Sequence, residues 1–344
     1  MKTLSIIIPC YNVEDSIQKC LDSLYAQTLP LNELEIIAVD DTSTDHTYEI
    51  LKENEKKHPD ILQIIHFDSN EGVSVSRNIG LQRAQGEYIG FVDGDDFVDI
   101  DMFERMIACA NKYHADFVAC KGSDITKHDA NEIKVSKMQR GIQQEETYLS
   151  LVEEEVRRDF LVFSDCSTRS WDKIYRLSFL KQHEIAFPSG IIGEDIYFCY
   201  LVYAFATNCC MMQETFYYHV IDENTQNSIY QNRQLERIHS MERLYHELIS
   251  REMFLSYYKE WEMIYIRKYY SDVMHLMTME FDAISDSVYA HIGSFMDTVF
   301  PNASANPYLQ NEAFEIEQFY MQTMHWTKED LNEFERMVRE ARGG

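Results

Sequence analysis

Short apolar runs alternate, over the first third of the chain, with segments in which apolar residues recur every three or four positions. Runs rich in β-branched residues predict strands, and the helical spacing between them predicts helices. The predicted strands are residues 4–9, 34–39, 61–67, 87–92 and 117–120, and the predicted helices lie around residues 16–24, 48–51, 79–84 and 102–110. Strands that alternate with helices predict an α/β fold, with a mainly parallel, Rossmann-like sheet and helices on both faces.

The pattern changes twice further along the chain. After about residue 121 the alternation fades into a polar, charged segment, and structure returns over residues 171–220. From about residue 231, Gly and Pro almost vanish and aromatic and Met residues lie among charges, which predicts a helical appendage. The predicted domains are residues 1–230, with halves 1–120 and 121–230, and residues 231–344.

The strongly acidic composition narrows the classes of partner. A net charge of −27 argues against nucleic acid, because phosphate binding needs a concentrated basic surface. The N-terminus lacks a signal-peptide pattern, and no run approaches the ~20 apolar residues of a transmembrane helix. We therefore expect a cytoplasmic protein. The eight cysteines include no C-x-x-C pair, so we expect reduced thiols, without a zinc site or a disulfide.

Candidate chemistry gathers where the predicted strands end. Asp93-Gly94-Asp95-Asp96 follows strand 87–92, and ligands of open α/β sheets bind beyond the carboxyl ends of the strands. Hard carboxylate ligands suit Mg²⁺ or Mn²⁺, which in turn can hold a diphosphate. An ordinary acidic turn is the alternative, since Asp and Gly are common in turns.

Three more loops follow predicted strands. The loop of Pro9, Tyr11 and Asn12 presents an aromatic ring for stacking on a base, and Asp40 and Asp41 can accept hydrogen bonds from a nucleoside. Thr44 or Asp45 is the candidate N-cap of the next helix. The third loop, from Asn70 to Gly80, runs into a helix whose N-terminus can face an anion. Its Arg77 is a candidate to stabilise a carboxylate cluster or a phosphate, with a solvated surface arginine as the alternative.

These motifs, in this order, resemble the family 2 glycosyltransferases with the GT-A fold. The resemblance covers residues 3–120, 171–176 and 193–198. It implies that Asp40 and Asp41 contact the uracil and ribose of a UDP-sugar, and that Asp95 binds the metal with Asp93 near the ribose. It also implies that Asp195 is the catalytic base, with Glu194 as the alternative. The donor-binding set that it implies is Pro9, Tyr11, Asn12, Asp40, Asp41, Asn70, Arg77, Asp93, Gly94 and Lys173.

The chemistry of inverting transfer is consistent with these roles. A carboxylate must take the proton of the acceptor hydroxyl, and a divalent cation can neutralise the leaving diphosphate. Without the resemblance, Glu194 and Asp195 would be read as acids that complement the dipole of the following helix. Asp172 stands where relatives commonly carry Asn, so Lys173 is kept as a candidate acceptor or phosphate contact. His219 and Asp93 are further candidate metal ligands, although a lone His is more often structural.

The resulting expectation is a metal-dependent, inverting hexosyltransferase that uses a UDP-sugar and Mn²⁺ or Mg²⁺. Its acceptor is expected to be a hydroxyl of a glycan, glycolipid or glycoprotein in bacterial surface polysaccharide or glycoprotein synthesis. Peripheral association with the inner face of the membrane, and a homodimer through the C-terminal helices, are further hypotheses. The alternatives are a catalytically silent nucleotide-sugar-binding module and a nucleotidyltransferase, although the first loop lacks the basic, Gly-rich character that a triphosphate requires.

Overall fold

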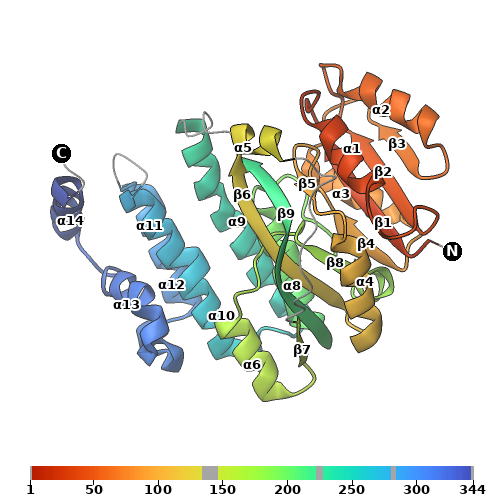
Figure 1. Cartoon of the computed structure of the whole chain (residues 1–344). Helices are drawn as coiled ribbons and strands as arrows, with labels where there is room; N and C mark the ends of the chain where they lie inside the picture. Colours follow the sequence, from red (N-terminus) through yellow and green to blue (C-terminus); the bar gives the residue numbers. More distant parts are fainter. Residues whose placement is uncertain (1, 134–145, 222–227, 280–283, 342–344) are drawn as a thin grey trace. The chain divides into compact units, whose positions relative to one another are not determined.

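The computed structural model describes residues 2–133, 146–221, 228–279 and 284–341 (Figure 1). The strands are β1 Leu4–Cys10, β2 Leu34–Asp40, β3 Leu62–His66, β4 Tyr88–Phe91, β5 Phe97–Val98, β6 Phe117–Thr126, β7 Glu146–Ser150, β8 Lys173–Arg176 and β9 Asn208–Ile221. The helices up to β9 are α1 Ile17–Tyr25, α2 Thr47–Lys57, α3 Val73–Arg83, α4 Met102–Tyr113, α5 Lys127–Glu132, α6 Glu154–Phe163, α7 Leu177–Gln182 and α8 Glu194–Phe205. After β9 follow α9 Ser228–Ser250, α10 Tyr258–Tyr265, α11 Asp272–Met279, α12 Asp286–Val299, α13 Glu315–Gln322 and α14 Lys328–Ala341.

The strands form one mixed sheet. Its order is β3-β2-β1-β4-β8-β6-β9-β5, and β7 pairs with β9. Strands β1 to β4 are parallel to their neighbours in that group, while β8 runs antiparallel to both β4 and β6. The predicted α/β fold with its parallel N-terminal half is confirmed, and the carboxyl ends of β1, β2 and β4 lie at one edge.

Strand β1 is largely apolar, with Ser5 as its polar residue, as expected for a strand buried on both faces. Its Leu4, Ile6 and Ile8 belong to the core that contains the inward residues of α1 and α4. On the other face, α3 lies so close that a Cβ on Gly80 would come within 2.4 Å of the Cγ2 atom of Ile7. The glycine therefore sets the distance between α3 and the sheet, and with it the place of the loop before α3.

Most predicted elements of the first 120 residues are present within a few residues of their expected ends. The structure adds β5, β7 and β8 together with α5 and α6, which the sequence reading missed. Part of the polar segment that we predicted as an excursion, residues 134–145, lies outside the described residues. The part before it is the continuation of β6 and then α5.

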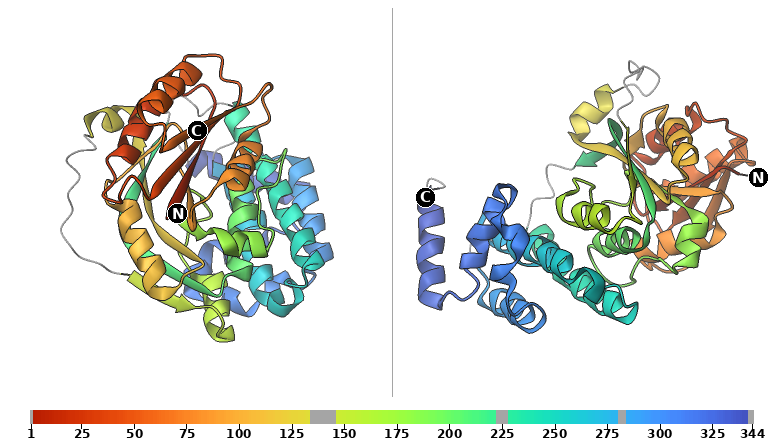
Figure 2. Two further views of the ribbon diagram at one scale, coloured as in Figure 1. Left: turned by 90° about the vertical axis from the view of Figure 1, so that its right-hand side faces the viewer. Right: turned by 90° about the horizontal axis from the view of Figure 1, so that it is seen from below.

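The chain divides into two compact units. The first comprises Met1–Val156, Asp165–Gly190 and Glu194–Thr225, and the second comprises Arg157–Ser164, Ile191–Gly193 and Gln226–Gly344. The single cut predicted after residue 230 stays a prediction. The helical appendage is confirmed as α9 to α14, which end at the C-terminus marked in Figure 2.

The second unit has its own core. The aromatic residues Trp261, Tyr265 and Tyr269 are fully buried in it. Glu260 is also buried, and its carboxylate accepts hydrogen bonds from Tyr308 and forms an ion pair with Arg158 at 2.7 Å. Among the described residues, no helix combines the length and the apolar character that crossing a membrane requires.

One expectation about the cysteines is wrong. The structure joins Cys109 of α4 and Cys210 of β9 in a disulfide. Five of the six other cysteines are buried, and Cys166 is half-buried. Nothing in the local sequence pairs two cysteines 101 residues apart, because their proximity is created by the packing of α4 on β9.

Candidate active site

The first loop leaves β1 in a strained conformation. Asn12 has a φ of 54°, a left-handed value that is uncommon for a residue other than Gly. Its side-chain oxygen accepts a hydrogen bond from the backbone of Thr44 at 2.8 Å. Asn12 therefore ties the first loop to the second, while the neighbouring Tyr11 stays half-exposed at 50%. Pro9 lies inside β1, paired with Val39 of β2.

The two acids of the second loop have different surroundings. Asp40 is fully buried, and one of its carboxylate oxygens lies 2.6 Å from Nδ1 of His66 at the end of β3. Asp41 is 4% exposed, and its two oxygens accept the backbone N–H groups of Glu71 and Gly72 at 2.7 and 2.8 Å. The carboxylate of Asp41 thus holds the start of the third loop.

The prediction that Thr44 or Asp45 is the N-cap of α2 is wrong, because His46 is the N-cap, and Asp45 precedes it. The Asp45 side chain accepts the N–H of Thr47, the first residue of α2, at 2.9 Å. Asn70 donates to the backbone oxygen of Asp41 at 3.2 Å, which adds a second link between the second and third loops.

The fourth loop, after β4, packs directly on the first. A Cβ on Gly94 would lie 3.3 Å from the backbone oxygen of Pro9 and 3.1 Å from a methyl group of Val13. The position therefore favours Gly, which lets the loop lie across the end of β1 and fixes where its carboxylates stand.

The three carboxylates of this loop differ in exposure. Asp95 is exposed, Asp93 is half-buried, and Asp96 is buried with 1% exposure. Asp96 accepts hydrogen bonds from the Tyr217 hydroxyl at 2.7 Å and from the backbone of Val220 at 2.8 Å. Burial, together with Asp93 and Asp95, raises the pKa of Asp96 to about 9. Desolvation and the charge of Asp93 also raise the pKa of Asp95.

Arg77 joins the fourth loop to the start of α8. It is 3% exposed, its Nη2 lies 2.8 Å from Asp93, and its Nη1 lies 2.8 Å from Glu194 and 3.1 Å from Asp195. Burial raises the pKa of Asp195 to about 6, although the charge of Arg77 opposes that rise and Glu194 adds to it. Asp93 of the fourth loop and Asp195 of α8 therefore both form ion pairs with Arg77.

Two other candidates have different surroundings. Lys173 is fully buried and donates to Asp172 at 2.5 Å and to the backbone oxygens of Ser167 and Arg169 at 2.7 and 2.8 Å. In this structure its ammonium group fixes the segment before β8. His219 is half-buried, with Nδ1 3.0 Å from Asp124, and its charge lowers the pKa of Asp95.

Sequence reasoning missed two connections of this site. Tyr217 accepts the N–H of Asp93 at 3.0 Å as well as donating to Asp96, so β9 supports the fourth loop. His66 lies near the end of the predicted strand 61–67 and is the last residue of β3, where it pairs with Asp40. The rule that ligands bind at strand ends is the signal that could have identified it. No local signal identifies Tyr217, because its partners lie more than 120 residues away.

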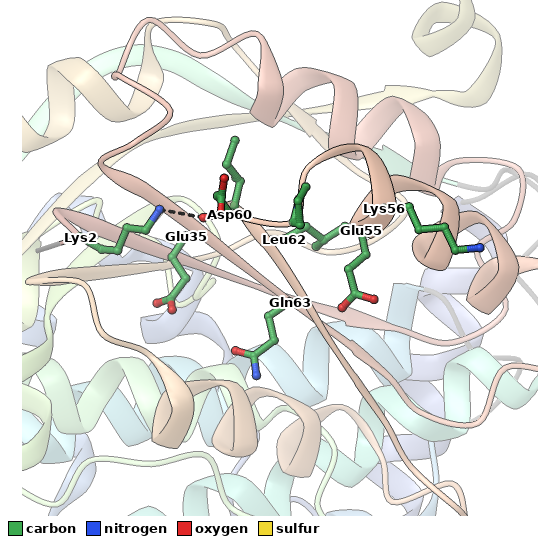
Figure 3. A pocket seen from close by; sticks show the side chains of 9 residues that line it. Lys2, Glu35, Glu55, Lys56, Asp60, Leu62 and Gln63 are labelled. Carbon is green, nitrogen blue, oxygen red and sulfur yellow. Dashed lines mark hydrogen bonds between the residues drawn. The ribbon is translucent and has the colours of Figure 1, made fainter.

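A cavity of about 550 Å³ lies at the opposite end of the sheet, around the starts of β1, β2 and β3 (Figure 3). Two of its polar side chains are hydrogen-bonded to neighbouring residues. Lys2 donates to the backbone oxygens of Leu34 and Asp60, and Glu55 accepts from Lys52 and from the backbone of Ile64. It contains none of the candidate residues.

The protein is similar in sequence to known glycosyltransferases. The family model described as Glycosyl transferase family 2 matches residues 5–173. A poly(ribitol-phosphate) beta-glucosyltransferase of Bacillus spizizenii is 32% identical over 63% of this chain and 32% of its own length. An uncharacterized glycosyltransferase of Haemophilus influenzae is 30% identical over 56% of this chain and 73% of its own length. The match thus spans only about a third of the first relative.

The fold is similar to that of a solved structure. The crystal structure of residues 1–349 of Staphylococcus aureus TarS in complex with UDP matches 99% of this chain and 91% of its own chain, with a TM-score of 0.65. The two sequences are 21% identical over that match, so this likeness establishes the fold alone.

Proposed function

Because the chain belongs to glycosyl transferase family 2, we propose that it is a metal-dependent, inverting glycosyltransferase. Its donor is a UDP-hexose, and its acceptor is a hydroxyl of a glycan, glycolipid or glycoprotein in the synthesis of a bacterial surface polysaccharide or glycoprotein glycan. The observation that carries this proposal is the shared contact of Arg77 with Asp93 and Asp195. It brings a donor-side acid and a candidate base to the same edge of the sheet.

Asp195 is the proposed general base. It accepts the proton of the acceptor hydroxyl as the oxygen attacks the anomeric carbon, and the UDP group leaves from the opposite face. A pKa of about 6 leaves the carboxylate ionised near neutral pH while it remains basic enough to take a proton. Asp195 also lies in the first turn of α8, where its negative charge stabilises the positive end of the helix dipole. This structural role is compatible with the proposed catalytic role.

The acids of the fourth loop are suited to a divalent cation. The charge of Asp93 raises the pKa of Asp95, and a cation bound between them would relieve that repulsion. Mg²⁺ and Mn²⁺ are commonly held by one or two carboxylates with substrate phosphates completing the shell. We propose Asp95 as the main ligand, with Asp93 and His219 as candidates, and Mn²⁺ or Mg²⁺ as the ion. When bound, the ion supplies Lewis-acid stabilisation of the diphosphate leaving group.

Within the described ranges, these three side chains do not converge on one point. Among the described residues, the group of three His, Cys, Asp or Glu residues whose side-chain N, O or S atoms lie within 4.8 Å of one another is Cys109, Glu146 and Cys210, and its two cysteines are the disulfide pair.

The first, second and third loops form the proposed nucleoside site. Tyr11 has the exposed ring for stacking on uracil, and Asp41 is 4% exposed while Asp40 is fully buried. Asn12 and Asn70 hold these loops together, and Gly94 lets the fourth loop approach them. Pro9 and Lys173 remain predicted members of the donor site. Lys173 would contribute indirectly, by holding the segment before β8 in place.

Asp41→Ala is expected to weaken UDP binding without changing the metal requirement. A hydrogen bond to a carboxylate contributes about 1.5–3 kcal/mol, so the dissociation constant should rise roughly 10- to 100-fold. Calorimetry with UDP and Mn²⁺ measures the change. Asp60→Ala, an exposed acid at the opposite edge of the sheet, is the control that should bind normally. Asp40→Ala tests the alternative that the buried acid holds the nucleoside, and normal affinity in both variants would remove this loop from the site.

The product is expected to have the inverted anomeric configuration, because Asp195 is proposed to act as a general base in a direct displacement. Direct displacement inverts the anomeric centre, so an α-linked UDP-hexose should give a β-linked product. The anomeric coupling constant of the purified product, measured by NMR, distinguishes an α-linked from a β-linked product. An α-linked product would contradict the proposed mechanism even if every binding prediction held.

The function as a whole is tested by a panel of UDP- and GDP-sugars, with and without Mn²⁺, monitored for nucleotide release. We expect release from a UDP-hexose that depends on the metal and stops on chelation. A silent binding module would instead bind UDP-sugar without release, even when acceptor glycans are added. Localisation at the inner face of the membrane and a homodimer through α9 to α14 stay proposals.

A further inference from the structure

Arg77 has an environment that differs from that of a surface arginine. It lies in the second turn of α3 and is 3% exposed, although its charge would ordinarily keep it in water. Three carboxylates surround its guanidinium group, those of Asp93, Glu194 and Asp195, at 2.8, 2.8 and 3.1 Å. These acids come from two segments about 100 residues apart along the chain. One side chain therefore joins the fourth loop to the start of α8.

The orientation of this guanidinium is fixed from several sides. Nη2 donates to Asp93 and Nη1 donates to both acids of α8. The guanidinium carbon also lies 5.2 Å from the centre of the Phe187 ring, within the range of a cation–π contact. Three of the five N–H groups donate to carboxylates, and Nε is buried without a hydrogen-bond partner among the described residues. Both terminal nitrogens are therefore oriented by acids of this chain.

The charges also favour a structural link over a phosphate contact. One arginine faces three acids, so the cluster carries an excess of negative charge before Asp95 is counted. Burial lowers the pKa of Arg77, but the charges of Asp195, Asp93 and Glu194 outweigh burial and raise that pKa well above its usual value. A diphosphate would therefore meet a cation that is already outnumbered by carboxylates.

We propose that Arg77 is a positioning residue of the transfer reaction, which fixes the Asp195 carboxylate relative to Asp93 and supplies a positive charge that Asp93, Glu194 and Asp195 share. This inference rests on the proposed function, because it takes Asp195 as the base. It reassigns Arg77 from the donor-binding set, in which the sequence resemblance had placed it. The role is exerted through Asp195 and the fourth loop and needs no contact with donor or acceptor.

Three variants test this role. Arg77→Met removes the charge and the fork of hydrogen bonds while keeping an unbranched side chain. Arg77→Lys keeps the charge but cannot bridge carboxylates as a planar fork does. Arg83→Met makes the same replacement at an exposed position on the same helix and should leave activity unchanged. Each variant is assayed for kcat and KM of the donor over a range of pH, and for UDP binding with Mn²⁺.

In Arg77→Met we expect kcat to fall roughly 100-fold, as for a catalytic group displaced by about 1 Å, while the donor KM changes little. The acid limb of the rate profile should move upward by about 1–3 pH units, because a nearby cation no longer favours the ionised base. In Arg77→Lys the acid limb should stay near its wild-type position, while kcat remains reduced. A large rise in donor KM and in the dissociation constant for UDP, with an unchanged acid limb, would overturn the proposal and make Arg77 a phosphate ligand.

A stability measurement tests the same cluster without any assay of transfer. The pKa of Asp195 is raised in the folded protein, so its contribution to stability is present at low pH and is lost as the pH rises through about 6. Loss of Arg77 raises that pKa further, so the fall in Tm caused by Arg77→Met should be larger at about pH 7.5 than at about pH 5. Equal destabilisation at both pH values would overturn the proposal. If the wild type transfers no sugar, the proposed function fails, while this measurement still decides whether Arg77 holds the carboxylates.

Discussion

Asp195→Asn is expected to bind UDP-sugar nearly normally and to transfer it roughly 10²–10⁴ times more slowly, the usual contribution of a positioned general base. The amide has almost the size of the carboxylate and can still accept a hydrogen bond from Arg77, which lies 3.1 Å away. It cannot take a proton from the acceptor hydroxyl. Single-turnover transfer, measured with donor already bound, separates the chemical step from binding and product release.

The pH profile of the wild type provides a second measurement of the same residue. Because the pKa of Asp195 is raised to about 6, transfer should fall as the pH drops through that value, and the slow residual reaction of Asp195→Asn should lose this limb. Glu194→Gln is the matched comparison, since Glu194 shares the same arginine nitrogen. Wild-type transfer by Asp195→Asn together with slow transfer by Glu194→Gln would move the base to Glu194.

The sequence was sufficient to predict the sheet edge and its loops. Strands β1, β2 and β4 are buried on both faces, so they appear as mainly apolar runs, and the polar residues at and after their carboxyl ends mark where each strand ends. Parallel strands then bring those ends together. The proximity of Asn12, Asp41 and Gly94 follows from this geometry without knowledge of any side-chain contact.

Contacts between segments that are distant in the sequence could not be predicted from local sequence patterns. Strand β5 has two residues, too few to show a period, and β8 lies in a segment that was recognised only as a motif. The ammonium of Lys173 looks available in the sequence, yet packing buries it against Asp172. The bond from Tyr217 to Asp96 likewise depends on the pairing of β9 with β5, which no local pattern encodes.

Asp95→Ala is expected to abolish the metal-dependent binding of UDP while leaving the fold intact. Asp95 is the exposed acid of the fourth loop, whereas Asp93 is paired with Arg77 and Asp96 is buried against Tyr217. Removing its charge should not destabilise the loop, because that charge repels Asp93 and raises the pKa of Asp96. Calorimetric titration of UDP into protein with Mn²⁺, and again with a chelator, measures the effect, and a thermal melt confirms folding.

The pH dependence of binding sharpens this prediction. A protonated carboxyl is a poor metal ligand, and the pKa of Asp95 is raised by desolvation and by Asp93, so metal-dependent affinity should begin to fall at a higher pH than it would for an ordinary aspartate. Asp60→Ala, at the other end of the sheet, should follow the wild-type curve. If folded Asp95→Ala binds UDP with wild-type affinity and keeps its dependence on Mn²⁺, the ion is held elsewhere, and Asp93 with His219 becomes the site to test.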